Sequence, residues 1–347
     1  MTREMARRIA VVLFNLGGPD RPEAIRPFLF NLFNDKAIIG LPQPLRAMLA
    51  SLIAARRTET ARRIYEKIGG QSPILEETRA QGKALKAELE QDGEITWDVF
   101  IAMRYWHPTV AEAMEAIRSF APDEIVLLPL YPQYSTTTTA SSIGSWKDEA
   151  FRQGLSAHAT LKCCYPTELG FVGAQADLIR AALNRLSLER VRILFSAHGL
   201  PQRIVDRGDP YPRQVAATVR AVIEKLEDLQ PDWAICYQSR VGPLKWIGPS
   251  VEEELRRAAT DKVGVVIVPI AFVSEHSETL VELDIEYRAL AKKLGISRYE
   301  RVPTVSTHAL FIAGLAELVR DAIRTHSESR SILCTTPPAE CVCEYRA

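Results

Sequence analysis

The feature that most constrains the fold is an alternation of strand-like apolar runs with helical periodicity, which occurs twice along the chain of 347 residues. Strands that alternate with helices form parallel sheets whose two faces are covered by helices. We therefore predict an α/β fold built from two similar units with four strands each. The expected strands are 9–15, 97–103, 124–130 and 156–163 in the first unit, and 191–197, 233–238, 263–270 and 299–304 in the second.

The ends of these strands support the pairing of the two halves. The first strands run into NLGGP and SAHGLP, and the third strands end in LLPLYPQYS and IVPIAFVSEH. Right-handed crossovers place all strand carboxyl ends of a unit on one edge, so we expect the two units to face each other across a central cleft. The predicted domains are 1–166 plus 305–330, then 167–304, with 331–347 as a cysteine-rich tail; a helix over 308–325 should pack back on the body.

Composition excludes several classes of protein. Lys plus Arg and Asp plus Glu both number 43, so the chain has no net positive charge that would attract nucleic acid. We therefore expect no nucleic-acid partner. The apolar run that starts at Ile9 is too short for a secretory signal or a membrane span. We expect a cytoplasmic protein in a reducing compartment, where the six cysteines are free thiols or metal ligands.

A helix expected over 44–55 carries apolar side chains at helical spacing, with arginines beside them. Such a face is usually part of the core. The functional alternative is an apolar helix face at the edge of the cleft that touches the membrane surface. This alternative predicts peripheral contact with the inner membrane. The apolar positions are Leu45, Met48, Leu49, Leu52 and Ile53.

The stretch 269–287 carries acidic residues three or four positions apart after a buried strand. Glu275, Glu278, Glu282 and Glu286 would share one helical face, with His276 at its start. Such a stripe is either a solvated surface or a path for cations or protons. Its position after a strand favours the second interpretation, because open α/β sheets bind ligands there.

His198 follows a strand in ILFSAHGLP, so it is expected at the same edge as the acidic stretch. A lone histidine is usually structural, but one placed opposite carboxylates can act as a base or a metal ligand near neutral pH. The corresponding turn of the first half, NLGGP, lacks the GxGxxG pattern of dinucleotide-binding sites. We therefore do not expect a dinucleotide cofactor.

The cysteines suggest a metal centre. Cys334, Cys341 and Cys343 have a C-x6-C-x-C spacing, and a fourth ligand could come from Cys163 or Cys164. A Cys₄ zinc site and a tail with spare thiols are the alternatives. Cys236 lies within an expected strand and should be a packed core thiol.

Three long motifs resemble the ferrochelatases, which insert ferrous iron into a porphyrin at the end of haem synthesis. The motifs are FSAHGLPQRIVDRGDPYP, CYQSRVGPLKWIGPS and PIAFVSEHSETLVELDIEY, and NLGGP, IGGQSP and LYPQYS extend the resemblance over nearly the whole chain. The resemblance implies two Rossmann-like domains with four-stranded parallel sheets, a chelatase-like fold, around a porphyrin cleft. It also implies protoporphyrin IX and Fe²⁺ as substrates, and two protons are released when the iron enters the ring.

The resemblance also implies roles for individual residues. His198 and Glu278 match the pair that faces the porphyrin centre from opposite sides and handles protons or Fe²⁺, and Glu275, His276 and Glu282 belong to the same acidic motif. Positions that hold or line the porphyrin correspond to Arg57, Tyr65, Ser72, Arg104, Tyr105, Tyr211 and Trp246. Leu16 and Lys245 depart from the usual pattern of the family.

For the cysteines, the resemblance favours a [2Fe-2S] cluster over zinc. Its ligands would be Cys334, Cys341, Cys343 and one of Cys163 and Cys164, and it would hold the tail against the first half. Two rival functions remain: a chelatase for another metal or tetrapyrrole, and a haem-binding or redox-sensing protein that uses the cluster as its switch. The sequence does not indicate the oligomeric state or the preference between protoporphyrin and coproporphyrin.

Overall fold

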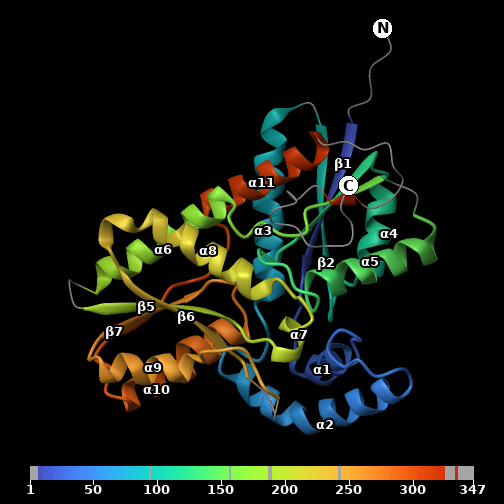
Figure 1. Cartoon of the computed structure of the whole chain (residues 1–347). Coiled ribbons are helices and arrows are strands. Elements are labelled where there is room, and N and C mark those ends of the chain that lie inside the picture. Colours follow the sequence, from blue (N-terminus) through green and yellow to red (C-terminus); the bar gives the residue numbers. More distant parts are fainter. Residues whose placement is uncertain are drawn as a thin grey trace. The chain divides into compact units, whose positions relative to one another are not determined.

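The computed structural model describes residues 7–93, 95–155, 158–186, 190–240, 244–324 and 333–334 (Figure 1). Contacts divide the chain into two compact units. The first is Met1–Tyr165 with Ile312–Ala347, and the second is Pro166–Phe311. The description below takes each unit by itself.

The first unit contains a parallel sheet in the order β2-β1-β3-β4-β9. The strands of this sheet are β1 (Arg7–Asn15), β2 (Ile95–Met103), β3 (Glu124–Pro129), β4 (His158–Leu161) and β9 (Leu333–Cys334). From Ile9 onward β1 is buried on both faces, as expected for a central parallel strand.

Helices cover both faces of this sheet. On one face Val12 and Phe14 of β1 pack in a core cluster with residues of α4 and α5. On the other face lies α3, where a Cβ atom added to Gly82 would be 3.6 Å from Leu13. The helices are α1 (Ile25–Phe33), α2 (Leu45–Glu66), α3 (Ile74–Leu89), α4 (Val110–Phe120) and α5 (Thr139–Gln153), with short 3-10 turns at Pro22–Ala24 and Glu90–Asp92.

The second unit contains a four-stranded parallel sheet in the order β6-β5-β7-β8. Its strands are β5 (Val191–His198), β6 (Asp232–Gln238), β7 (Gly264–Pro269) and β8 (Tyr299–Arg301). Its helical elements are α6 (Leu169–Arg185), α7 (Gln202–Val205), α8 (Tyr211–Lys225), a 3-10 turn (Glu227–Leu229), α9 (Val251–Thr260), a π-helix (Glu278–Glu286) and α10 (Tyr287–Lys293).

Two separate core clusters fill the faces of the second sheet. Phe195 and Val268 pack with residues of α6 and α8, whereas Leu194 and Ile267 pack with residues of α9, the π-helix and α10. Figure 1 shows α6 and α8 on one side of β5–β7, with α9 and α10 on the other. Because consecutive side chains of a strand point to opposite faces, each strand contributes to both clusters. The last helix, α11 (Ala309–Arg324), runs from the end of the second unit into the first.

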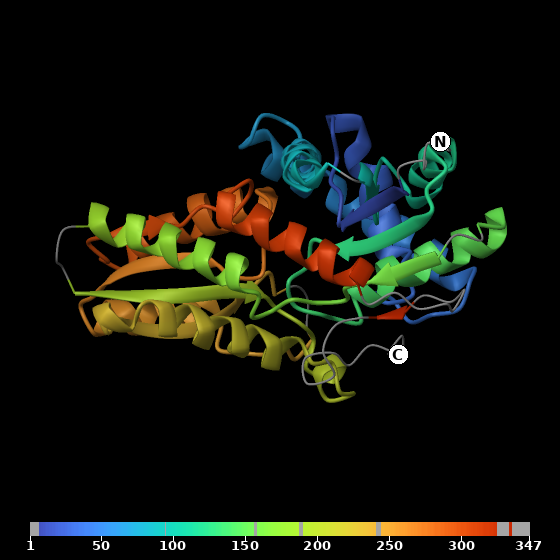
Figure 2. The same ribbon diagram turned by 90° about the horizontal axis from the view of Figure 1, so that it is seen from above.

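The prediction of an α/β fold with two similar four-stranded parallel sheets is confirmed. Both sheets have the order second-first-third-fourth strand, so the duplication read from the sequence is present in the topology. The first sheet has one short addition, β9, which pairs with β4 through Thr160↔Leu333 and Leu161↔Cys334. Figure 2 shows this short strand, in red, beside the green β4. The central cleft expected from the sequence stays a prediction.

The acidic stretch does not form the α-helix that its spacing predicts. The helix begins at Glu278 and is a π-helix, and at its end Tyr287 N donates to the carbonyl of Glu282, five residues earlier. Glu275 lies before the helix, so the prediction that it shares a helical face with the other glutamates is wrong. π-helical turns are rare and often occur at functional sites.

The predicted apolar helix near 44–55 is the start of α2, and its apolar side chains are exposed. Leu45 is 55% exposed, Met48 68% and Leu52 48%, so these residues do not form part of the core. Among the described residues, no helix is long and apolar enough to cross a membrane.

Candidate active site

The candidate site lies where the parallel strands of the second sheet end. His198 is the last residue of β5 and pairs in register with Gln238, the last residue of β6. Ser196 of β5 pairs with Pro269 at the end of β7, and the chain from β7 leads to the acidic stretch. The sheet therefore brings together residues that are up to 80 positions apart, on the edge where open α/β folds bind ligands.

His198 and Glu278 form a close pair. His198 Nδ1 lies 2.8 Å from Glu278 Oε2, and the two side chains are 39% and 27% exposed. Burial disfavours the charged imidazolium, but the charge and hydrogen bond of Glu278 raise the pKa of His198 above its ordinary value of 6.5. Burial likewise disfavours the carboxylate, yet His198 and then His276 hold the pKa of Glu278 well below its ordinary value of 4.5.

This contact corrects one expectation. The resemblance implied that His198 and Glu278 face a porphyrin from opposite sides. A separation of 2.8 Å leaves no room for a macrocycle between them, so that placement is wrong. Both groups belong to the second unit and form a close pair there.

His276 is a second histidine near Glu278, and its ring faces the same carboxylate oxygen as His198. It is buried, its Nδ1 donates to the carbonyl of Ser274 at 3.0 Å, and its Nε2 lies 3.9 Å from Glu278 Oε2. Phe272 packs against the ring, with centroids 4.7 Å apart. The bond to Ser274 fixes the orientation of the imidazole, so Nε2 is the nitrogen that meets Glu278.

Glu282 is held by several donors at the end of β6. Ser239 N donates to Glu282 Oε1 at 2.8 Å, and the Ser239 hydroxyl and Gln238 Nε2 donate to Oε2 at 2.5 Å and 3.2 Å. Burial and the charge of Glu278 raise the pKa of Glu282 above 4.5, although the bonds from Ser239 act in the opposite direction. Glu282 is thus the carboxyl of this pair that more readily takes up a proton.

Glu275 is engaged in a different interaction. Arg301 NH1 lies 2.8 Å from its Oε1, and the backbone N–H of Thr304 donates to the same oxygen at 3.0 Å. The Thr279 hydroxyl donates to Oε2 at 2.5 Å. These bonds tie the segment before the π-helix to the end of β8, so Glu275 anchors the site, and the structure does not bring it to His198.

The turn after His198 requires glycine. A Cβ atom at Gly199 would lie 2.8 Å from the carbonyl oxygen of Gln238 and 3.3 Å from the Trp246 ring. Trp246 reaches this turn through a bridge to Pro201. Tyr211, the first residue of α8, is buried; burial, with smaller effects of Tyr237 and Glu278, raises its pKa well above 10.0. Trp246 and Tyr211 therefore lie in the same part of the second unit as His198.

The other predicted binding residues lie in the first unit. Arg57 stacks over Phe33 at 5.8 Å from the ring centroid, and Tyr65 is buried in the cluster around α1. Ser72 is buried, and a Cβ atom at Gly18 would lie 2.6 Å from its side chain. This close approach explains the need for glycine in NLGGP.

Arg104 and Tyr105 share a partner that the sequence analysis missed. Asp35 Oδ2 accepts from Arg104 NH2 at 2.9 Å and from the Tyr105 hydroxyl at 2.7 Å, and the Ser141 hydroxyl also donates to it. Burial opposes the charge of Asp35, but Arg104 and these donors keep its pKa below 3.8. Tyr105 is fully buried, so it supports Arg104 rather than lining an open surface.

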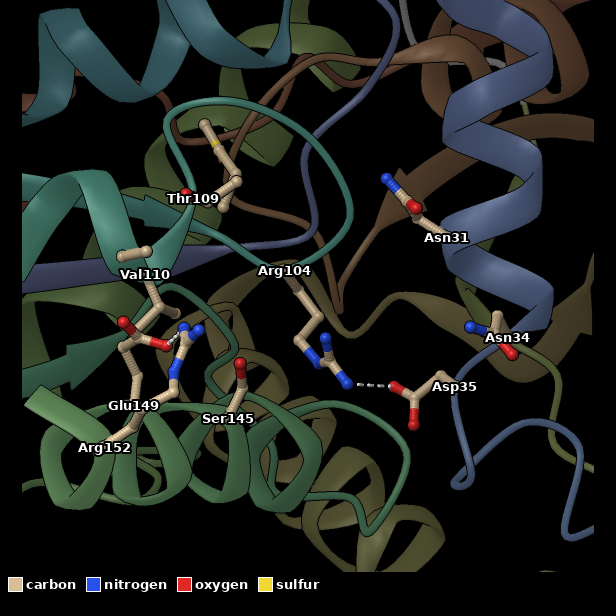
Figure 3. Close-up of a pocket in the computed structure, with 11 residues that line it drawn as sticks. Asn31, Asn34, Asp35, Arg104, Thr109, Val110, Ser145, Glu149 and Arg152 are labelled. Carbon is tan, nitrogen blue, oxygen red and sulfur yellow. Dashed lines mark hydrogen bonds and ion pairs between the residues drawn. The ribbon is translucent and has the colours of Figure 1, made fainter. Parts of the chain in front are cut away.

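Arg104 and Asp35 line a polar pocket of about 410 Å³ in the first unit. Figure 3 shows the Arg104–Asp35 pair at one end of this pocket and the Glu149–Arg152 pair at the other. Each arginine of the pocket is paired with a carboxylate, so the charges of the two pairs balance. Asp35 lies in a loop without a recognisable motif, and no sequence signal could have pointed to it.

The cysteines fall partly outside the described residues. Cys163 and Cys164 are buried, with their Sγ atoms 3.5 Å apart, and Cys236 is buried in the core as expected. The backbone of Cys334 belongs to β9, whereas Cys341 and Cys343 lie outside the described residues. Within the described part of the chain, no group of three or more His, Cys, Asp or Glu side chains is arranged to hold a metal ion.

Two parallel sheets of identical strand order, with a histidine–carboxylate pair at the strand ends of one, define a chelatase-like α/β protein. The structure of the sirohydrochlorin chelatase SirB from Bacillus subtilis subspecies spizizenii, in complex with cobalt, has the same fold. Its TM-score to this chain is 0.53 at 11% identity, covering 92% of this chain and 97% of SirB.

Sequence comparisons narrow this class to one family. The family model "Ferrochelatase" matches residues 8–323. A ferrochelatase of Caulobacter vibrioides (strain NA1000 / CB15N) is 50% identical, covering 99% of both chains. A ferrochelatase of Wolbachia sp. subsp. Drosophila simulans (strain wRi) is 53% identical over 89% of this chain and 98% of its own. The chain belongs to the ferrochelatase family, whose members are lyases that insert iron into a porphyrin.

Proposed function

We propose that this protein inserts ferrous iron into protoporphyrin IX to form haem, the last step of haem biosynthesis, with release of two protons. Membership of the ferrochelatase family supports this reaction. The observation that carries the chemistry is the contact of 2.8 Å between His198 and Glu278 at the carboxyl ends of β5–β7. Metallation needs a base for the pyrrole protons, and this pair contains one.

In the proposed mechanism His198 is the base. Glu278 accepts a hydrogen bond from Nδ1, so in neutral His198 the other nitrogen, Nε2, carries no proton and can accept one from a pyrrole N–H. The imidazolium that results is stabilised by the adjacent carboxylate. His276, held by Ser274, positions Glu278, and Glu275 fixes the start of this segment through Arg301.

Fe²⁺ is a substrate and must leave the protein for the macrocycle. Carboxylates with one imidazole bind Fe²⁺ loosely, which suits a transient site at Glu278 and His198. The family resemblance supports porphyrin-holding or porphyrin-lining roles for Arg57, Tyr65, Ser72, Arg104, Tyr105, Tyr211 and Trp246, with the two arginines as partners for propionate groups. Arg104 reaches this role already oriented by Asp35 and Ser141.

An anaerobic assay of metal insertion tests the function. Purified protein is mixed with ferrous, cobalt or zinc ions and with protoporphyrin or coproporphyrin, and insertion is followed by the porphyrin absorbance. We expect turnover with Fe²⁺ and protoporphyrin. Turnover only with another metal or porphyrin would favour the rival chelatase, and haem binding without any turnover would favour the sensor.

We further propose that the tail binds a [2Fe-2S] cluster through Cys334, Cys341, Cys343 and one of Cys163 and Cys164. The pairing of β9 with β4 supports this ligand set, because Cys334 is in register with Leu161, two residues before Cys163. Two neighbouring buried thiols beside that strand suit a thiolate-ligated centre. The cluster would supply a one-electron redox centre, and the metallation chemistry above does not depend on it.

The cluster predicts a coloured protein. We expect visible absorbance from the purified chain that is lost in Cys343→Ser and retained in Cys236→Ser, because Cys236 is a core thiol in the second unit. Iron and acid-labile sulfide should be lost together with the colour. A colourless wild-type protein with one equivalent of zinc would refute the cluster.

We also propose that the exposed apolar start of α2 gives peripheral contact with the inner membrane. Leu45 and Met48 are more than half exposed, and the nearby arginines would favour anionic lipid. In vesicle co-sedimentation, the bound fraction should fall when both residues are replaced by serine. Equal binding of the double variant would show that this face does not contact lipid.

A further inference from the structure

The hydroxyl of Tyr287 lies between two carboxylates. Its oxygen is 3.1 Å from Glu282 Oε1 and 3.3 Å from Glu252 Oε1. A phenol has one proton, so with both carboxylates ionised the two oxygens share it. When one of the carboxyl groups carries a proton and donates it to Tyr287, each contact becomes a separate hydrogen bond.

The π-helix is the reason that Tyr287 meets Glu282. In an α-helix, side chains three or four positions apart are neighbours, and residues five apart diverge. Here Tyr287 N bonds to Glu282 O, so the turn closes over five residues and brings these two side chains to the same side. An α-helical version of this segment would separate them.

Glu252 is brought to Tyr287 by the start of α9. Ser250 caps this helix through a reciprocal capping box with Glu253, which fixes the first turn where Glu252 lies. Residues of α9 and α10, including Tyr287, pack in one core cluster. Tyr287 is only 6% exposed, whereas Glu282 and Glu252 are both partly exposed, so a buried hydroxyl joins two carboxyl groups from different elements.

We propose that Tyr287 and Glu252 relay protons from Glu282 to solvent during metallation. In one transfer, the O–H bond of protonated Glu282 breaks and its proton binds Tyr287 Oη. At the same time the original O–H bond of Tyr287 breaks and its proton binds Glu252, which then releases it to water. The tyrosine stays neutral, and Glu282 is again a carboxylate that can accept the next proton.

The electrostatics of the three groups agree with this direction. Burial and Glu278 raise the pKa of Glu282, so Glu282 can hold a proton that arrives from the site. Burial, and then the two carboxylates, raise the pKa of Tyr287 far above 10.0, which disfavours a phenolate and favours the concerted exchange. The inference rests on the proposed function, because only metallation supplies the protons.

The relay is tested with the variants Tyr287→Phe and Glu252→Ala in the anaerobic iron-insertion assay. We expect kcat to fall by about tenfold or more in each, with porphyrin Kd and the KM for iron unchanged, since neither group touches substrate. Added formate should restore kcat of Glu252→Ala in proportion to its concentration, because a small acid can replace the missing carboxyl. A glutamate that acted only structurally would not give this rescue.

Tyr299→Phe is the matched control, because its hydroxyl donates to the backbone carbonyl of Leu283. We expect kcat within twofold of wild type and no effect of formate. Normal kcat in either Tyr287→Phe or Glu252→Ala would overturn the relay, and so would a loss in Glu252→Ala that formate does not restore. The proposed function is judged separately, by iron insertion in the wild-type protein and its loss in His198→Ala. If both are observed, a negative result for the relay excludes only the relay.

Discussion

Replacing His198 by alanine is expected to lower kcat for iron insertion by about 100- to 10,000-fold, the range that a general base contributes. The variant loses the nitrogen that would accept the pyrrole protons, and Glu278 keeps a charge without its partner. Porphyrin binding should change by less than about tenfold, roughly 1.4 kcal/mol, because the proposed porphyrin contacts involve other side chains. The measurements are anaerobic steady-state kinetics and a fluorescence titration of porphyrin binding.

His107→Ala is the matched control for this experiment. His107 also pairs with a glutamate, Glu112, at 2.9 Å, but both side chains are about half exposed and lie in the first unit. It should retain wild-type kcat. Near-normal turnover of His198→Ala would remove the imidazole from the mechanism, whatever the control shows.

Replacing Glu278 by glutamine is the second change with a large expected effect. It should also abolish metallation, because the imidazolium formed at His198 would lose its adjacent carboxylate and any transient site for Fe²⁺ would lose its charge. The substitution preserves the size of the side chain and leaves one oxygen to accept from His198 Nδ1, so folding and porphyrin affinity should change little. Turnover within a few-fold of wild type would exclude a role for this charge.

The same variant predicts a change in titration. In wild type, Glu278 raises the pKa of His198 above 6.5, so the neutral base is populated only above that pKa and activity should fall as pH drops through it. In Glu278→Gln the main raising effect is gone and burial remains, so the pKa of His198 should fall. NMR titration of the histidine ring protons in ligand-free protein measures this, and an unchanged pKa would contradict the pairing.

Strands such as β3 and β7 could be predicted because they are continuous apolar runs in a parallel sheet. Val191–His198 was found with only its last residue missing, and its helical neighbours followed from periodicity. The two-residue β9 could not be predicted, since Leu333–Cys334 pairs with β4 only through tertiary contacts and has no pattern of its own. The π-helix was missed for a related reason: spacings of three and four are typical of an α-helix, and nothing local signals a turn of five.

The sequence predicts which residues belong to the candidate site, but it does not predict how their side chains are arranged. His198, Glu278 and Glu282 were identified from their positions after strands, and β5 and the π-helix bring them together. Spacing alone placed Glu275 with them, whereas Arg301 and Thr304, which are remote in sequence, draw it away. Asp35 and Glu252 carry no motif, so their contacts with Arg104 and Tyr287 became visible only in the folded chain.

The most direct measurement is proton release during a single anaerobic turnover, followed with an indicator dye in weakly buffered solution while the porphyrin absorbance reports haem formation. Wild-type protein should release two protons per iron inserted, in the same kinetic phase as haem, and His198→Ala should show neither signal on that time scale. Haem formation and proton release at the wild-type rate in His198→Ala would contradict the assignment of His198 as the base.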